Sequence, residues 1–151
     1  MAFSSAGMGL MMRCQFEENT ADQYGGVGFT SSSASVELVH CEMNHNEAAY
    51  GGGLYVSDSS HVSISESVLS ENKATQYGGA IYQTTPTWLD ITDVNVTSNV
   101  AIAGGAMFSE YPQLNIARSR FSHNNASGWG GALMLTMTSD SLISIQSSVF
   151  S

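Results

Sequence analysis

Residues 69–82 read Leu69-Ser-Glu-Asn72-Lys-Ala74-Thr-Gln-Tyr77-Gly78-Gly79-Ala80-Ile81-Tyr82, and this stretch contains both motifs that decide the fold. The first motif is the glycine pair, which returns along the chain at steps of 26, 27, 26 and 26 residues. The pairs are Gly25-Gly26, Gly51-Gly52, Gly78-Gly79, Gly104-Gly105 and Gly130-Gly131. Self-similarity with a fixed period of this size is the signature of a solenoid or array.

The second motif is an asparagine with an apolar residue three positions before it and an alanine two positions after it. Its copies are centred on Asn19, Asn46, Asn72, Asn99 and Asn124. The asparagine precedes the glycine pair by 5 or 6 residues in every copy. Two motifs that stay in step through five copies indicate one repeating structural unit.

A pair of apolar residues at positions −10 and −8 from the asparagine completes the unit. The pairs are Val36 and Leu38, Val62 and Ile64, Leu89 and Ile91, and Leu114 and Ile116. Apolar residues two apart indicate half-buried strands. Further strands are expected before the asparagine and after the glycine pair, and no segment shows sustained helical spacing. The sequence thus predicts an all-β, single-stranded parallel β-helix of about five coils of 25–29 residues, with three short strands per coil.

Stacked coils explain the recurring residues. The asparagines are expected to form a ladder of amide hydrogen bonds, as stacked asparagines do in cross-β structures. Asparagine also tolerates the left-handed conformation of a sharp corner, the small alanine suits a crowded corner, and the glycine pair permits positive φ or close backbone approach. Two aromatic columns recur, and the spacing leaves open which of them faces inward. They are Tyr24, Tyr50, Tyr77 and Trp129, and Phe29, Tyr55, Tyr82 and Phe108.

The motifs resemble the repeats of chlamydial polymorphic outer-membrane proteins. The resemblance rests on Gly78-Gly79-Ala80-Ile81, Gly104-Gly105-Ala106-Met107 and Gly130-Gly131-Ala132-Leu133, with Phe16-Glu-Glu-Asn19 and Phe121-Ser-His-Asn124. It covers roughly residues 9–151 and implies a right-handed parallel β-helix that is exposed at a cell surface and used in adhesion. The chain shows neither the outer-membrane β-barrel segment nor the secretion signal that accompany this family.

The alternative architecture is a leucine-rich repeat, since residues 94–101 loosely fit its consensus and the period is in its range. The repeats are poor in leucine, however, and lack a helical half. We expect residues 1–151 to form a single β-helix domain. It begins and ends in mid-repeat, so we expect a segment of a longer chain or of a filament.

Composition narrows the classes of function. The chain carries 13 Asp and Glu against 4 Lys and Arg, for a net charge of −9, which argues against nucleic acid and anionic membrane surfaces as partners. No apolar run is long enough to cross a bilayer. Low charge and abundant small polar residues indicate an extracellular or cell-surface location. The expected partners are other protein subunits, including copies of this chain, or cell-surface glycans, and no cofactor is expected.

Two cysteines, Cys14 and Cys41, occupy the same repeat position on adjacent coils and are a candidate disulfide. The alternative is a pair of small core residues. With His40 and His45 they also form a zinc candidate. Because His40 and Cys41 should point to opposite faces of one strand, no metal site is expected.

Acidic columns are further candidates for catalytic sites, because β-helix lyases and hydrolases gather such residues on an outer face. Position −6 contains His40, Glu66, Asp93 and Arg118, and position −9 contains Glu37, Asp90 and Asn115. A carboxylate pair beside an arginine suits acid–base chemistry or Ca²⁺, and solvated surface pairs are the alternative. We expect no catalytic residues and favour an extracellular structural or adhesive scaffold. The alternative is a β-helix that binds or cleaves polysaccharides.

Two sequons, at Asn95-Val-Thr97 and Asn125-Ala-Ser127, are candidate glycosylation sites. Asn95 should point outward because Val94 and Val96 flank it on the opposite face.

Overall fold

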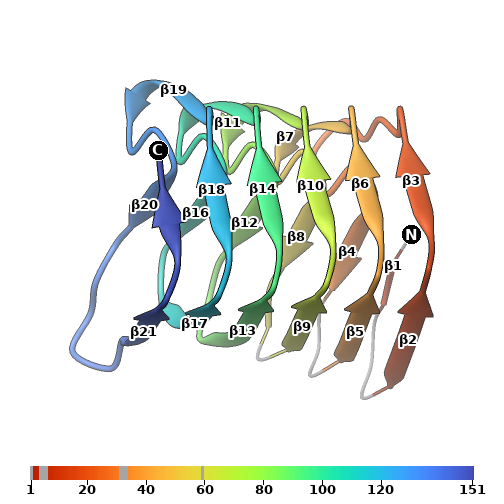
Figure 1. The fold of residues 1–151 in the computed structure, drawn as a ribbon, viewed down its shortest axis with the longest axis horizontal. Helices are drawn as coiled ribbons and strands as arrows, with labels where there is room; N and C mark the ends of the chain where they lie inside the picture. Colours follow the sequence, from red (N-terminus) through yellow and green to blue (C-terminus); the bar gives the residue numbers. More distant parts are fainter. Residues whose placement is uncertain (1, 4–6, 31–33, 59) are drawn as a thin grey trace.

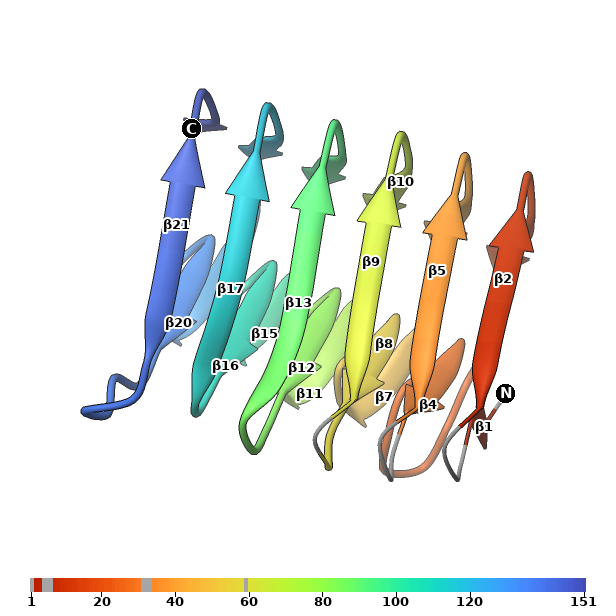
Figure 2. The same ribbon diagram turned by 90° about the horizontal axis from the view of Figure 1, so that it is seen from below.

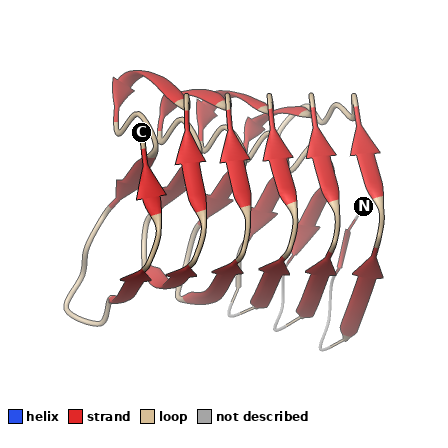
Figure 3. Cartoon of the chain, in the orientation of Figure 1, coloured by secondary structure: helices blue, strands red, loops and turns tan. Residues whose placement is uncertain are grey.

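A computed structural model describes residues 2–3, 7–30, 34–58 and 60–151, and its strands stack coil upon coil into a rod (Figure 1). The paired strands are parallel, and partner residues lie 25 to 29 positions apart, from Thr87↔Pro112 to Gln113↔Leu142. The described residues consist of strands and loops (Figure 3). Among these residues no helix is long and apolar enough to cross a membrane. The predicted all-β parallel β-helix is confirmed.

Each coil runs through four parallel sheets, which we call B, C, D and A in the order of the chain. Sheet B contains β2 (Met8–Met12), β5 (Ser35–Val39), β9 (His61–Ser65), β13 (Thr87–Thr92), β17 (Pro112–Ala117) and β21 (Leu142–Gln146). Sheet C contains β3 (Gln15–Glu17), β6 (Glu42–Asn44), β10 (Val68–Ser70), β14 (Asn95–Thr97), β18 (Arg120–Ser122) and β22 (Val149–Phe150). Sheet D contains β7 (Glu47–Tyr50), β11 (Lys73–Tyr77), β15 (Val100–Ala103) and β19 (Asn125–Trp129). Sheet A contains β1 (Ala2–Phe3), β4 (Gly28–Thr30), β8 (Leu54–Val56), β12 (Ile81–Gln83), β16 (Met107–Ser109) and β20 (Leu133–Leu135).

Sheet D corrects the prediction of three strands per coil. The repeat pattern places the alanine after the asparagine at a corner, but Ala74 lies inside β11 and pairs with Ala48 of β7. Both alanines are buried, with 2–3 % of their surface exposed. Their small side chains therefore reflect tight packing under a short strand, a constraint that resembles a corner in sequence.

Three of the corners in each coil contain a residue in the left-handed region. The corner from sheet B to sheet C uses position −6, such as Glu66 (φ 48°), and that from sheet C to sheet D uses position −1, such as Glu71 (φ 54°). The corner from sheet D to sheet A uses the first glycine of each pair, such as Gly78 (φ 66°). The left-handed residue is thus the neighbour of the ladder asparagine, which corrects the expectation that the asparagine itself adopts this conformation.

The main core fills the interior of the rod. The apolar pairs of sheet B point inward, and Leu89 and Ile91 are fully buried. They meet residues of sheets C and A such as Leu69 and Ile81, which are also buried. The strands of sheet B lie side by side (Figure 2). The residues that alternate with the inward-facing pairs lie on the outer face of this sheet.

Candidate functional site

The five ladder asparagines are hydrogen-bonded to one another along the rod. The Nδ2 of each donates to the Oδ1 of the next, at 2.9 Å from Asn19 to Asn46 and from Asn46 to Asn72. The same pattern continues through Asn99 to Asn124. The three inner asparagines are completely buried. Since every rung is used in this way, the ladder holds the coils together and is not available to a ligand.

The two glycines of each pair have different tasks. The first adopts positive φ, as at Gly25, Gly51, Gly104 and Gly130. In the first four pairs, the second glycine lies against the next coil. A Cβ at Gly79 would be 2.0 Å from the carbonyl oxygen of Gly105, and a Cβ at Gly105 would be 2.1 Å from that of Gly131. Gly26 and Gly52 are equally close to the following coil, at 2.4 and 2.3 Å. These glycines set the shape and spacing of the corner.

Cys14 and Cys41 lie on adjacent coils, and both are free thiols, so the candidate disulfide is not formed in this structure. The Cys41 thiol is completely buried and donates to the carbonyl oxygen of Met11 at 3.4 Å. Burial raises the pKa of this thiol. The His40 side chain is exposed and contacts Glu66. It lines a surface hollow together with Cys14, but the buried Cys41 does not line that hollow. The described residues contain no group of three or more metal-ligating side chains.

The column at position −6 lies at the exposed corner between sheets B and C. His40 contacts Glu66 at 3.3 Å, and Arg118 contacts Asp93 at 2.7 Å. The hydrogen bonds from Arg118 lower the pKa of the Asp93 carboxyl. These charges pair with one another across coils on an open corner, which is the arrangement of solvated surface pairs.

The two sequon asparagines are exposed. Asn95 lies in β14 between the buried Val94 and Val96, and its side chain faces outward. Asn125 begins β19.

The two aromatic columns meet outside the main core, where sheet D turns into sheet A. Tyr82 and Phe108 form a second cluster together with Tyr50, Tyr55 and Tyr77. The rings of Tyr77 and Phe108 stack with centroids 4.7 Å apart. The Phe29 side chain lies outside the described part of the structure. Because Tyr82 is 6 % exposed, its ring is buried within this cluster, which forms a small second core.

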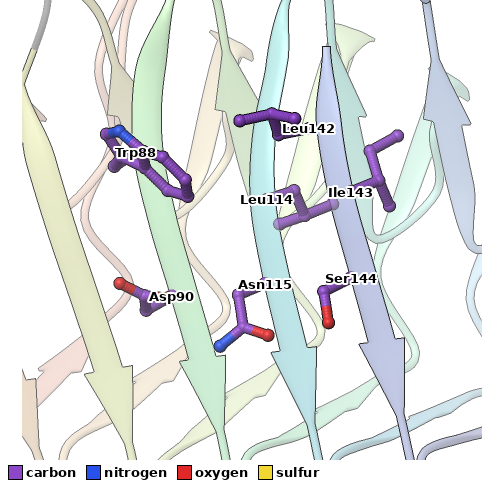
Figure 4. A pocket seen from close by; sticks show the side chains of 7 residues that line it. All are labelled: Trp88, Asp90, Leu114, Asn115, Leu142, Ile143 and Ser144. Atoms are coloured by element: carbon purple, nitrogen blue, oxygen red, sulfur yellow. The ribbon is translucent and has the colours of Figure 1, made fainter.

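A hollow with a volume of about 420 Å³ lies on the outer face of sheet B, and Figure 4 shows the side chains that line it. Trp88 projects beside it, with 45 % of its surface exposed. Asp90, Asn115 and Ser144 form a polar row across the three neighbouring strands β13, β17 and β21 (Figure 4). The hollow thus combines one exposed aromatic face with three polar side chains that occupy equivalent positions on successive coils.

Two hydrogen bonds shape this hollow. Gln113 stands in register between Trp88 and Leu142, and its Nε2 donates to the carbonyl oxygen of Asp140 at 2.7 Å. Gln113 is thereby drawn to the side, and Leu142 lines the hollow beyond it. On the other side, His61 Nε2 lies 3.0 Å from Asp90 Oδ2 and orients that carboxylate. Asp90 is the one carboxylate among the described residues that line the hollow.

The acidic column at position −9 contributes to this site only in part. Asp90 and Asn115 line the hollow, whereas Glu37 is two coils from Asp90 with Ser63 between them. Sequence reasoning missed Trp88. A signal was present, because Trp88 precedes Asp90 by two positions in the same strand and so shares its outward face.

In a comparison with known protein families, residues 1–121 match a family model described as a right handed beta helix region. No match emerged from the curated proteins or from the solved structures that were compared with the chain.

Proposed function

The chain belongs to the right-handed β-helix family, and from this premise we propose that it is an extracellular scaffold that binds glycans through the hollow beside Trp88. The rod supplies a rigid platform, since hydrogen bonds link each coil to the next along the sheets and the asparagine ladder. The family includes scaffolds and polysaccharide-acting enzymes, so the argument for this chain rests on the site itself.

The observation that carries the proposal is the pairing of an exposed indole with a polar row. A sugar ring has apolar C–H faces and hydroxyl groups around its rim. The faces stack on aromatic rings, and the hydroxyls need fixed polar partners. Trp88 offers such a ring, while Asp90 accepts hydrogen bonds and Asn115 and Ser144 both donate and accept them.

The spacing of the row favours an extended chain of sugars over a single small ligand. Asp90, Asn115 and Ser144 follow one another in register, one per coil. Neighbouring strands lie about 4.8 Å apart. Successive hydroxyl groups of a polysaccharide aligned with the rod axis would meet one polar side chain after another. The ligand class we propose is therefore a neutral, cell-surface or matrix polysaccharide.

We favour binding without cleavage. Glycoside hydrolysis generally requires two carboxyl groups on either side of the bond. Asp90 is the single carboxylate among the described lining residues, and it is engaged by His61. Incubation of the purified protein with the polysaccharide it binds should leave the polymer length unchanged. Release of shortened products would favour the alternative of a polysaccharide-cleaving enzyme.

The chain contains two tryptophans, which provide a matched experiment. Trp88→Ala should weaken binding on a glycan array by about tenfold, the loss expected for one aromatic contact. Trp129→Ala is the control because Trp129 is 68 % exposed and lies in sheet D, away from the hollow. Equal binding by both variants and the parent would contradict the proposal. Concentration-dependent filaments without any glycan binding would favour a purely structural role.

A further inference from the structure

A second hollow lies on the other side of the coil, where sheet A leads into the loops toward sheet B. It has a volume of about 310 Å³ and is lined by Tyr77, Phe108, Glu110, Tyr111, Thr136 and Thr138. None of these residues lines the Trp88 hollow. The lining combines three aromatic rings with one carboxylate and two threonine hydroxyl groups.

Two hydroxyl groups of neighbouring residues hold the Glu110 carboxylate in place. The Tyr82 hydroxyl donates to its Oε1 at 2.5 Å, and the Thr84 hydroxyl donates to its Oε2 at 3.1 Å. A tyrosine phenol is protonated at neutral pH and can donate, and burial together with the hydrogen bond to Glu110 raises the pKa of Tyr82 further. Each carboxylate oxygen accepts one of these bonds and keeps a further lone pair for another partner.

No positive charge of the described residues neutralises this carboxylate. The ion pairs of the structure join Lys73 to Glu47 and Arg118 to Asp93, and the histidine pairs involve other carboxylates. A fixed carboxylate in a ring-lined hollow is complementary to a cation. A metal ion is a poor candidate because a hard cation requires several oxygen ligands, and the described residues contain no such cluster.

The rings favour an organic cation. Tyr77 and Phe108 stack at 4.7 Å with an interplanar angle of 16°, and Tyr111 is 44 % exposed. Aromatic faces attract ammonium groups, and the attraction is strongest where water is partly excluded. We propose that this hollow binds an alkylammonium group, with Glu110 supplying the charge and Tyr111 the exposed ring face. The site is independent of the glycan site on sheet B.

Choline is the probe that tests this site, and the matched probe is its neutral isostere, in which carbon replaces the nitrogen. The purified protein is titrated with each probe at constant ionic strength, and amide chemical shifts are followed by NMR. Choline should shift resonances around Glu110 and Tyr111, and the isostere should bind at least about tenfold more weakly. Equal binding of the two probes, shifts located elsewhere, or no binding of choline would overturn the proposal.

Two variants separate the contribution of the Glu110 charge to choline binding from that of the Tyr111 ring. Glu110→Gln retains an acceptor for Tyr82 but removes the charge, and it should weaken choline binding about tenfold, whereas Tyr111→Ala should weaken it severalfold. Glu66→Gln removes the same charge at the corner between sheets B and C and should leave binding unchanged. Unaltered binding by Glu110→Gln would overturn the proposal. Trp88→Ala should bind choline normally, so failure of the glycan proposal would be recognised separately. Methylammonium in place of choline distinguishes primary from quaternary groups.

Discussion

Asn72 and Asn99 share two hydrogen bonds through one oxygen, because the Nδ2 and the backbone N–H of Asn72 both donate to Asn99 Oδ1, at 3.0 and 2.9 Å. Asn72 in turn accepts the same two bonds from Asn46. Its Nδ2 also donates to the carbonyl oxygen of Met43 at 2.8 Å. Each inner asparagine thus satisfies polar groups on three successive coils.

Asn72→Ala should therefore destabilise the protein by about 3 kcal/mol or more, since it removes the acceptor of two buried donors of Asn46 and leaves the Asn46 backbone N–H without a partner. The measurement is the free energy of unfolding from urea denaturation. The matched control is Asn19→Ala at the exposed end of the ladder, for which we expect a loss of about 1 kcal/mol or less. Similar losses for the two variants would show that burial of the ladder does not determine its contribution.

The second glycine of each pair allows a direct test of close approach. Gly79→Ala places a Cβ 2.0 Å from the carbonyl oxygen of Gly105, and the neighbouring backbone must move apart to admit it. Gly131→Ala is the same substitution at the same repeat position, but the nearest atom is 3.6 Å away, which is an ordinary contact. We expect a loss of about 3 kcal/mol or more for Gly79→Ala and almost none for Gly131→Ala. The measurement is the midpoint of thermal unfolding of the two variants under the same conditions. Equal midpoints would contradict the prediction.

The repeat explains why the fold could be predicted from the sequence and the site only in part, through Asp90 and Asn115. Stacked coils impose the same steric and hydrogen-bonding requirements at equivalent positions. The asparagine and the glycine pair therefore recur, and a single sequence is enough to reveal them. The left-handed residue before the ladder asparagine varies between coils as Glu71, His45 and Ser98, and it left no such pattern. The burial of Tyr82 depends on the angle between sheet D and sheet A. The spacing of residues along the sequence does not reveal this angle. Trp88 has His61 and Gln113 at the equivalent positions of the neighbouring coils. A search for repeated residues therefore does not detect it.

Cys41 should react with iodoacetamide far more slowly than Cys14 in the folded protein. Cys41 is completely buried, while Cys14 is partly exposed. The raised pKa of Cys41 also means that less of it is thiolate at a given pH than in the unfolded chain. We expect a difference of at least about tenfold in the rate of modification, measured by peptide mass spectrometry. Rapid labelling of both thiols would contradict this burial, and labelling of neither thiol before reduction would show that the candidate disulfide between Cys14 and Cys41 forms in solution.

Asn95 and Asn125 are exposed sequon asparagines. We expect each of them to carry a glycan when the chain is secreted from eukaryotic cells. Asn95→Gln and Asn125→Gln should each remove one glycan, since both side chains face solvent. Intact mass before and after enzymatic deglycosylation measures the change. A mass that is unaffected by the enzyme would show that these asparagines remain unmodified.

The aromatic cluster predicts a loss of stability in alkali. Burial raises the pKa of Tyr55 from 10.0 to about 12, and the nearby Tyr24, Asp58 and Glu110 add to the shift. The folded state therefore holds this phenolic proton more tightly than the unfolded state does. The resulting contribution to stability is complete below about pH 10 and is lost as the pH rises through 12.

Tyr55→Phe should consequently move the midpoint of alkaline unfolding to higher pH. It removes a phenol that ionises at lower pH in the unfolded chain than in the folded protein, and this ionisation favours unfolding. Circular dichroism follows unfolding, and phenolate absorbance follows ionisation in the same samples. Tyr82→Phe also removes a phenol with a raised pKa, but it deletes the hydrogen bond to Glu110 as well, so it should lower stability at neutral pH. Ionisation of every tyrosine while the chain is still fully folded would contradict the burial of these two rings.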